Sequence, residues 1–220
     1  MVVQEEWMSD PRNHCVPVTK VFEDHKNPEV SYMVMPFLRP VDTPPFEYVK
    51  EIIDFTDQIL EVSVNYLPTF ALDTNIPRVW NSSTRKGSHI GTDYNLGFHQ
   101  TINRYHRDCV LKNLMMDADA MYPEGFHAVG LDFKPDHSGF AKYTSRSAVG
   151  VKYYFVDFGI SVHIPESMSS KLVTGFLGRD RDPPELSDEI PYDPFKLDIF
   201  IIGNMLKHEF YMVGVHFNGG

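Results

Sequence analysis

The sequence predicts an α+β domain, because segments with strand patterns and segments with helical periodicity follow one another along the chain. The chain has 220 residues, of which 42% are hydrophobic, so one domain of ordinary size can bury its own core. Two short strands come first and a helix follows them. A strand of the buried type and a second apolar helix lie in the last third of the sequence.

Residues 14–38 predict two short strands joined by a turn. The first strand begins at His14 and continues to Phe22, and the second covers residues 31–35. Pro36 ends the second strand because proline cannot donate to a strand ladder. Residues 24–28 carry the Asp, Asn and Pro that are typical of a turn.

A helix is predicted next, with Thr43 as its cap and Pro44 at its first position. From residue 46 to residue 62, apolar side chains recur at helical spacing, and acidic and lysine side chains fill most of the other face. In the last third, residues 151–156 predict a buried strand that ends at Asp157, and residues 199–206 predict an apolar helix.

Two long stretches interrupt this pattern. Residues 63–103 show no sustained period, and a structureless run of this length is uncommon inside a compact domain. Residues 114–116 are strand-like, whereas residues 118–150 mix loop with short strand. We interpret 63–103 and 118–150 as insertions; the first is either an unusual insertion or translated non-coding sequence.

Composition narrows the class of protein. The net charge of −10 argues against a nucleic-acid-binding surface. The first residues lack the pattern of a targeting peptide, and no apolar run reaches the length of a membrane span. Cys15 and Cys109 make neither a disulfide framework nor a metal site. We therefore expect an intracellular protein, cytoplasmic or nuclear, without a membrane partner.

Three polar residues carry the chemistry. Asp108 closes a His-Arg-Asp run, Asn113 follows five positions later, and Asp157 precedes Phe-Gly at the end of the predicted strand. An Asp of this kind can accept the proton of an attacking hydroxyl. Asn and Asp supply the hard oxygen atoms that magnesium prefers. Gly159 allows the chain to leave the strand at unusual dihedral angles.

With these motifs the chain resembles the protein kinases, most closely the fungal-type protein kinases. Residues 32–38 resemble the last small-lobe strand, the gatekeeper and the hinge. Residues 183–185 resemble the end of the activation segment, and residues 198–203 the next large-lobe helix, whose Asp braces the catalytic loop in the family. The resemblance implies a protein kinase-like fold, with 1–39 as small-lobe remnant and hinge and 40–220 as an incomplete, mainly helical large lobe.

The resemblance also implies roles for individual residues. The base would be Asp108, and Arg107 would pair with a phosphate or acid of the activation segment. Val110 stands where serine/threonine kinases usually carry Lys, so Lys112 could supply that charge. The ATP site and the Mg²⁺ site would be formed by Met35 as gatekeeper, by the backbone near Pro36 and Leu38, and by Asn113 and Asp157 as metal ligands.

Three features depart from the family pattern. No glycine-rich loop or phosphate-binding Lys precedes residue 14, residues 63–103 separate the large-lobe helix from the catalytic loop, and the chain stops soon after Leu206. We therefore expect a sequence truncated at both ends, either a fragment or a mis-assembled reading frame of a longer kinase.

The expected function is ATP- and Mg²⁺-dependent phosphoryl transfer to a Ser, Thr or Tyr hydroxyl of a protein substrate, performed by the intact parent. One alternative is a catalytically dead pseudokinase fragment that acts as a binding module. Another is a small-molecule kinase of the aminoglycoside or choline type. Those kinases usually carry Gly in place of Arg107 and lack the closing Pro-Glu, which argues against them.

Overall fold

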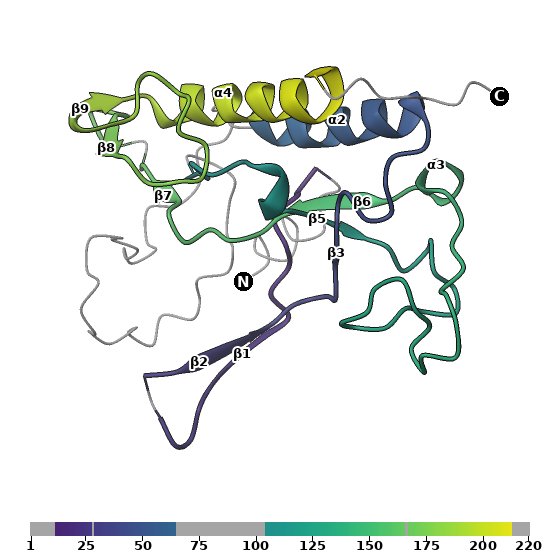
Figure 1. Ribbon diagram of the computed structural model, residues 1–220. Coiled ribbons are helices and arrows are strands. Elements are labelled where there is room, and N and C mark those ends of the chain that lie inside the picture. Colours follow the sequence, from purple (N-terminus) through teal and green to yellow (C-terminus); the bar gives the residue numbers. More distant parts are fainter. Residues whose placement is uncertain (1–11, 28, 65–103, 166, 213–220) are drawn as a thin grey trace.

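The structure of the chain, a computed structural model, describes residues 12–27, 29–64, 104–165 and 167–212 (Figure 1). It is an α+β arrangement of helices and small antiparallel sheets, as the sequence predicts. Residues 65–103, nearly all of the first predicted insertion, lie outside the described residues. Among the described residues, no helix combines the length and apolar character needed to cross a membrane.

An antiparallel hairpin projects from the body of the molecule (Figure 1). It consists of β1 (Lys20–Glu23) and β2 (Ser31–Val34). The predicted turn is present, and its Asp24 Oδ1 accepts hydrogen bonds from the backbone N–H of Lys26 and Asn27, at 2.7 and 3.1 Å. The first strand is shorter than expected, because residues near its predicted start contact β6 (Lys152–Phe155) instead, through a backbone bridge from Cys15 to Phe155.

The central sheet has three antiparallel strands in the order β3-β5-β6. They are β3 (Arg39–Pro40), β5 (Leu114–Asp117) and β6. The strands predicted at 114–116 and 151–156 are thus confirmed. Alternate side chains of β5 and β6 are buried, and Met116 and Tyr153 are 0% and 1% exposed, so one face of this sheet forms part of the core.

Helix α2 (Val49–Val64) confirms the predicted helix but not its start. The prediction that Thr43 and Pro44 begin the helix is wrong; the peptide bond between them is cis, both residues lie in a bend, and the helix begins at Val49. The buried carboxylate of Glu51 reaches back instead. Its Oε2 accepts hydrogen bonds from the backbone N–H of Glu47 at 2.7 Å and of Tyr48 at 3.3 Å. Both amides belong to the residues just before the helix, so a side chain of the first turn fixes the chain that enters it.

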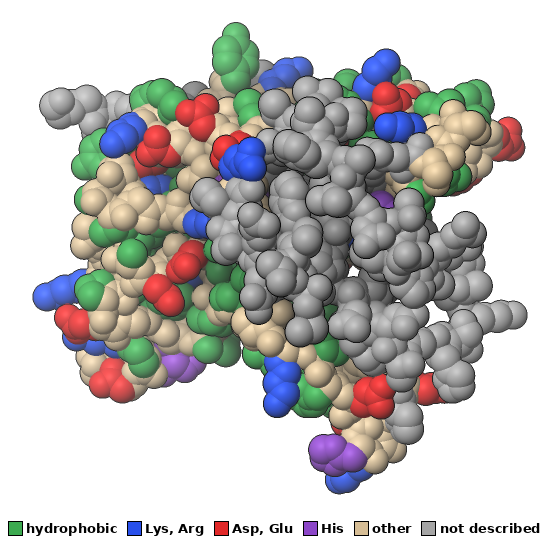
Figure 2. Space-filling model, turned by 180° about the vertical axis from the view of Figure 1, so that it is seen from behind, with side chains coloured by type: hydrophobic (Ala, Val, Ile, Leu, Met, Phe, Trp, Pro, Cys, Tyr) green, Lys and Arg blue, Asp and Glu red, His purple; other side chains and the backbone are tan. Residues whose placement is uncertain are grey.

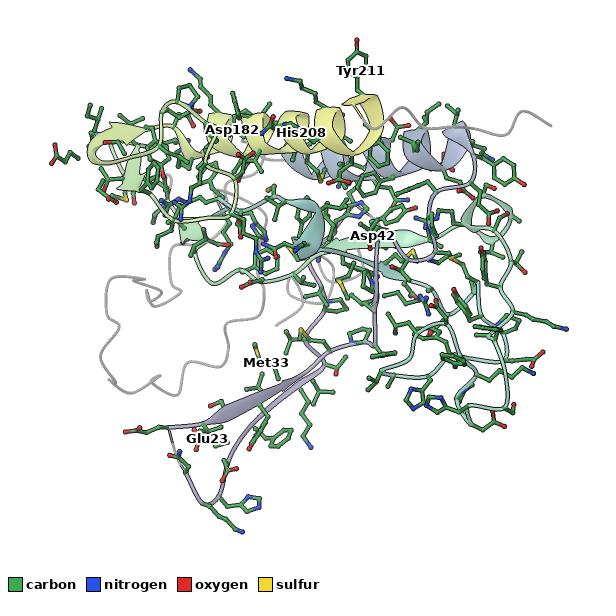
Figure 3. The ribbon with its side chains drawn as sticks, viewed as in Figure 1. Glu23, Met33, Asp42, Asp182, His208 and Tyr211 are labelled. Atoms are coloured by element: carbon green, nitrogen blue, oxygen red, sulfur yellow. The ribbon has the colours of Figure 1, made fainter. Side chains whose placement is uncertain are left out.

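Helix α4 (Pro194–Leu206) contains the helix predicted at 199–206 and begins five residues earlier. Asp193 caps it, because its Oδ1 accepts from the backbone N–H of Phe195 and Lys196, at 2.9 and 3.4 Å. A π-helical turn, η2 (Lys207–Met212), continues it, and Tyr211 stands out from this end (Figure 3).

The core lies between the two long helices and the central sheet. Helices α2 and α4 run side by side over the sheet (Figure 1). The buried side chains that join these layers include Phe55, Ile59, Leu114, Met116, Tyr153, Leu197, Ile201 and Ile202.

Residues 118–150 fold back against the body with little regular structure beyond the short helix α3 (Arg146–Val149). Arg39 anchors them. Its guanidinium lies 4.6 Å from the ring centre of Tyr122 and 4.5 Å from that of Phe126, and its Nη1 donates to the carbonyl of Leu131 at 2.7 Å. The segment therefore packs on the domain.

Two further small sheets surround the loop that precedes β5. One pairs β4 (Arg104–Tyr105) with β7 (Val162–His163), and the other pairs β8 (Val173–Gly175) with β9 (Ser187–Tyr192). The sequence pattern did not predict β3, β4, β7, β8 or β9. On the face seen from behind, charged side chains of both signs are scattered over the described surface (Figure 2).

Candidate functional site

The His-Arg-Asp loop lies between β4 and β5, and Asp198 of α4 holds its backbone. Arg107 has a φ of 65°, a conformation that costs energy for a residue other than glycine. Asp198 Oδ2 accepts from the backbone N–H of His106 at 2.8 Å, and its Oδ1 accepts from that of Arg107 at 2.6 Å. Two adjacent amides are thus fixed by one carboxylate, which maintains the unusual turn.

Asp198 is itself almost completely enclosed, with 3% of its surface exposed. Burial raises its pKa to about 7, and the hydrogen bonds from the two backbone amides act in the opposite direction. The thiol of Cys109 lies beside this carboxylate, and burial raises the pKa of that thiol well above its ordinary value. Cys109 is therefore a packed structural residue rather than a reactive thiol.

Asn113 orients the carboxylate of Asp108. It lies at the end of the 3₁₀ turn η1 (Leu111–Asn113), and its Nδ2 donates both to the carbonyl oxygen and to Oδ2 of Asp108, at 2.9 Å in each case. Asp108 is buried, at 7% exposure. Because the amide nitrogen of Asn113 donates to Asp108, its amide oxygen is the atom that could bind a cation.

Asp157 follows a residue, Val156, whose backbone contacts Asn113 and His106. It follows β6 with a φ of 61° and is exposed. The neighbouring Val156 donates its N–H to the carbonyl of Asn113 at 2.9 Å, and the carbonyl of Val156 lies 2.9 Å from His106 Nε2. The His106 ring also packs 4.9 Å from that of Phe158, as expected of a structural histidine.

Asn113 and Asp157 carry oxygen atoms that could bind a metal ion, but they do not belong to a preformed cluster of metal ligands among the described residues. Within the part of the chain that the structure describes, no group of three or more His, Cys, Asp or Glu side chains could hold a metal ion. Asn113 and Asp157 would therefore contribute one amide oxygen and one carboxylate. Mg²⁺ is commonly held in proteins by one or two such groups together with water and phosphate oxygens.

Arg107 faces the segment between β7 and β9. Its Nη2 donates to the carbonyl of Thr174 at 3.0 Å and to the hydroxyl of Tyr192 at 2.7 Å. The side chain approaches Gly175 so closely that a Cβ there would lie 2.8 Å from Nη2. The sequence predicted that Arg107 binds a phosphate or acid; in this structure its donors serve backbone carbonyls and a hydroxyl.

Arg179 is a member of the site that the sequence analysis missed. Its backbone N–H donates to Asp108 Oδ1 at 2.7 Å, and its Nε lies 3.9 Å from Asp108 Oδ2. Gly178 makes this approach possible. It has a φ of 112°, and a Cβ there would stand 3.0 Å from the carbonyl oxygen of Arg107. No sequence motif marks this contact, because it joins residues 71 positions apart.

The remaining predicted residues lie apart from these contacts. Met35 and Pro36 are exposed on the connection after β2, Leu38 is buried, and Lys112 is exposed. A cavity of about 240 Å³ lies elsewhere, between α2, α3 and β6, and its walls include Asp54, Gln58 and Tyr153. The expected ATP and Mg²⁺ site, which would join Met35 and the hinge to Asn113 and Asp157, stays a prediction.

Comparisons with models of known protein families, with curated proteins and with solved structures each found no match. The function proposed below therefore rests on the geometry of the His-Arg-Asp loop.

Proposed function

We propose that this chain carries the catalytic loop of a protein kinase-like phosphotransferase, which transfers the γ-phosphoryl group of ATP to a Ser, Thr or Tyr hydroxyl of a protein. The observation that carries the proposal is the bracing of the loop. Asp198 binds the amides of His106 and Arg107, and Asn113 orients Asp108. Phosphoryl transfer asks a protein chiefly for positioning and charge stabilisation, and this loop is built for positioning.

In the proposed step, Asp108 accepts the proton of the substrate hydroxyl as the hydroxyl oxygen bonds to the γ-phosphorus. The bond between that phosphorus and the β–γ bridging oxygen breaks, and ADP leaves. Asn113 keeps the carboxylate in place through its 2.9 Å hydrogen bond to Oδ2. A base must lie within hydrogen-bond reach of the proton that it removes, so a fixed carboxylate is the first requirement.

The oxygen atoms of Asn113 and Asp157 are of the kind that binds a magnesium ion. Asn113 and Asp157 would hold Mg²⁺, which neutralises charge on the phosphates when bound. The connection between β2 and β3, which contains Met35, Pro36 and Leu38, would meet the adenine ring.

Transfer of labelled γ-phosphate from Mg-ATP to a mixed Ser/Thr/Tyr peptide library tests the proposal on the full chain. Replacing Asp108 by Asn should lower the rate about 10²–10⁴-fold, the usual contribution of a positioned base. Replacing the exposed Asp119 by Asn is the matched control and should leave the rate unchanged. A wild-type rate no higher than that of Asp108→Asn would contradict the proposal.

A binding module without catalysis is the second candidate, and the hairpin favours it. Phe22, Tyr32 and Met33 are 44, 44 and 55% exposed, and Figure 3 shows Met33 on the projecting hairpin, away from the helices. Exposed apolar patches commonly mark interaction surfaces. Thermal melting separates the two candidates, because Mg-ATP at a hundredfold excess over its Kd should stabilise a nucleotide-binding chain by about 2.7 kcal/mol. Only the binding module would leave the Tm unmoved.

A further inference from the structure

We propose that Arg179 is a positioning residue of the reaction, which fixes Asp108 through its backbone N–H and places a guanidinium charge beside it. The inference rests on the proposed function and extends it to a residue outside the His-Arg-Asp loop. The geometry is a pair of contacts from one residue, with the amide 2.7 Å from Oδ1 and Nε 3.9 Å from Oδ2. Asn113 approaches the same Oδ2, so each carboxylate oxygen of Asp108 has a fixed neighbour.

The position of Arg179 is fixed from both sides. Before it, Gly178 packs against the carbonyl of Arg107 with a φ of 112°. After it, the amide nitrogen of Asn204 on α4 donates to Asp180 Oδ2 at 2.8 Å and to Asp182 Oδ2 at 3.2 Å, and Figure 3 shows Asp182 beside this helix. The segment therefore rests on the loop at one end and on α4 at the other.

The charge at this position meets a need of the chemistry. Transfer of a phosphoryl group spreads negative charge over its oxygen atoms, and cations aimed at that charge lower the barrier. Arg107 is buried, and its Nη2 is occupied by the carbonyl of Thr174 and the hydroxyl of Tyr192. Among the described residues, the ion pair of Asp108 is with Arg179.

The side chain of Arg179 is also accessible to a substrate. It is 55% exposed, whereas that of Asp108 is 9% exposed. The guanidinium carries five donors in a fixed fork that matches phosphate oxygens. In the reaction, the hydroxyl proton passes to Asp108, the new P–O bond forms and the β–γ bond breaks. Arg179 takes part in no bond change. It fixes the position of Asp108 and places its positive charge beside the charge that develops on the phosphate.

Four variants of the full chain test this role, with labelled Mg-ATP and a mixed peptide library. Arg179→Gln keeps the backbone N–H and removes the charge, and should lower kcat about 10- to 100-fold, with KM for ATP within about twofold. Arg179→Lys should restore part of kcat. Lys171→Gln removes a positive charge from an exposed position in the same segment and should leave kcat unchanged. Millimolar guanidinium should rescue Arg179→Ala and leave the wild type unaffected, a result that a merely structural role would not produce.

The outcomes separate this inference from the proposed function. If the wild type is active and Arg179→Gln is unaffected, the role of Arg179 is overturned and the kinase proposal stands. The same conclusion follows if activity is lost in Arg179→Gln and neither Arg179→Lys nor guanidinium restores it. A larger loss in Lys112→Gln than in Arg179→Gln would assign the charge to Lys112. An inactive wild type would remove both proposals. Hydrogen exchange at residues 178–182 in the wild type and in Asp108→Ala tests the contact itself without any activity. Faster exchange in the variant is expected, because the Arg179 amide loses its acceptor, and unchanged exchange would overturn the contact.

Discussion

Replacing Asp198 by Ala should destabilise the chain and release the His-Arg-Asp loop. The variant leaves the backbone N–H of His106 and of Arg107 without their acceptor in a buried site. A buried donor without a partner costs about 1–3 kcal/mol, so two cost roughly 2–6 kcal/mol. The variant also loses an unfavourable contribution, the desolvation of the buried carboxylate, which the raised pKa of Asp198 indicates. We therefore expect a net loss of about 1–4 kcal/mol, or roughly 2–16 °C in Tm for a chain of this size.

The pH dependence gives a second, independent measurement. Burial raises the pKa of Asp198 to about 7 in the folded chain, against about 3.9 in the unfolded chain. Between these values the folded state binds the extra proton, so the stability due to this group falls as pH rises from about 4 to about 7. Asp198→Asn removes the titration. The difference in unfolding free energy between wild type and Asp198→Asn should therefore narrow between pH 5 and pH 8.

Urea unfolding at both pH values measures these quantities, with hydrogen exchange at residues 106 and 107 as the local readout. Lys196→Ala, an exposed change on the same helix, is the control and should stay within about 0.5 kcal/mol of the wild type. A full-length chain in which Asp198→Ala neither lowers the urea midpoint nor speeds exchange would refute the bracing role. A gap that widens toward pH 8 would refute the assignment of the raised pKa.

Three further predictions concern other parts of the site and its support, and each is measured by urea unfolding. Gly178→Ala should cost more than about 1 kcal/mol, since the position has a φ of 112° and a Cβ there would lie only 3.0 Å from the carbonyl oxygen of Arg107. Gly203→Ala, in the open part of α4, should instead stabilise the chain by about 0.5–1 kcal/mol, and equal effects would contradict the reasoning. Glu51→Ala should cost about 3 kcal/mol, because it leaves Arg146 buried without its acid and the amides of Glu47 and Tyr48 without an acceptor; a loss below about 1 kcal/mol would count against this. Burial lowers the pKa of His106, so the unfolded chain binds a proton below about pH 6.5 more readily than the folded chain does. The stability due to this group should therefore fall as pH drops from 7.5 to 5.5, opposite in sign to the contribution of Asp198. The difference in unfolding free energy between wild type and His106→Gln should shrink over that range, and a difference that grows would contradict the reasoning.

The long elements could be predicted from the sequence because their signals are local. The periodicity of residues 46–62 and the apolar run at 151–156 gave α2 and β6, each with a small error in its bounds. The start of α2 was missed because a helix can take its cap from inside as well as from before. Thr43 and Pro44 match the usual sequence pattern of a helix start, but the capping hydrogen bonds are made by Glu51.

The site was predictable in its loop residues and not in its surroundings. Asp108 and Asn113 stand five residues apart and belong to one short loop, so a motif marks both, although their direct hydrogen bond was not predicted. Arg179 contacts the same carboxylate from 71 residues away, and the short strands β8 and β9 that deliver its segment have no alternating pattern. Pairing between distant segments is decided by tertiary packing, which local patterns do not encode. The expected meeting of Asp108 with the hinge near Met35 stays a prediction.

The hydrogen bonds of Asp198 also set an order of events during folding. Its contact with His106 spans 92 residues, so the loop that holds Asp108 cannot reach its final geometry until α4 has formed and docked. A ribosome would complete almost the whole described chain before this carboxylate was available. The proposed base would therefore be among the last features to mature, and a nascent chain would expose the loop without its brace. Activity, in this view, reports on completed folding of the helical layer.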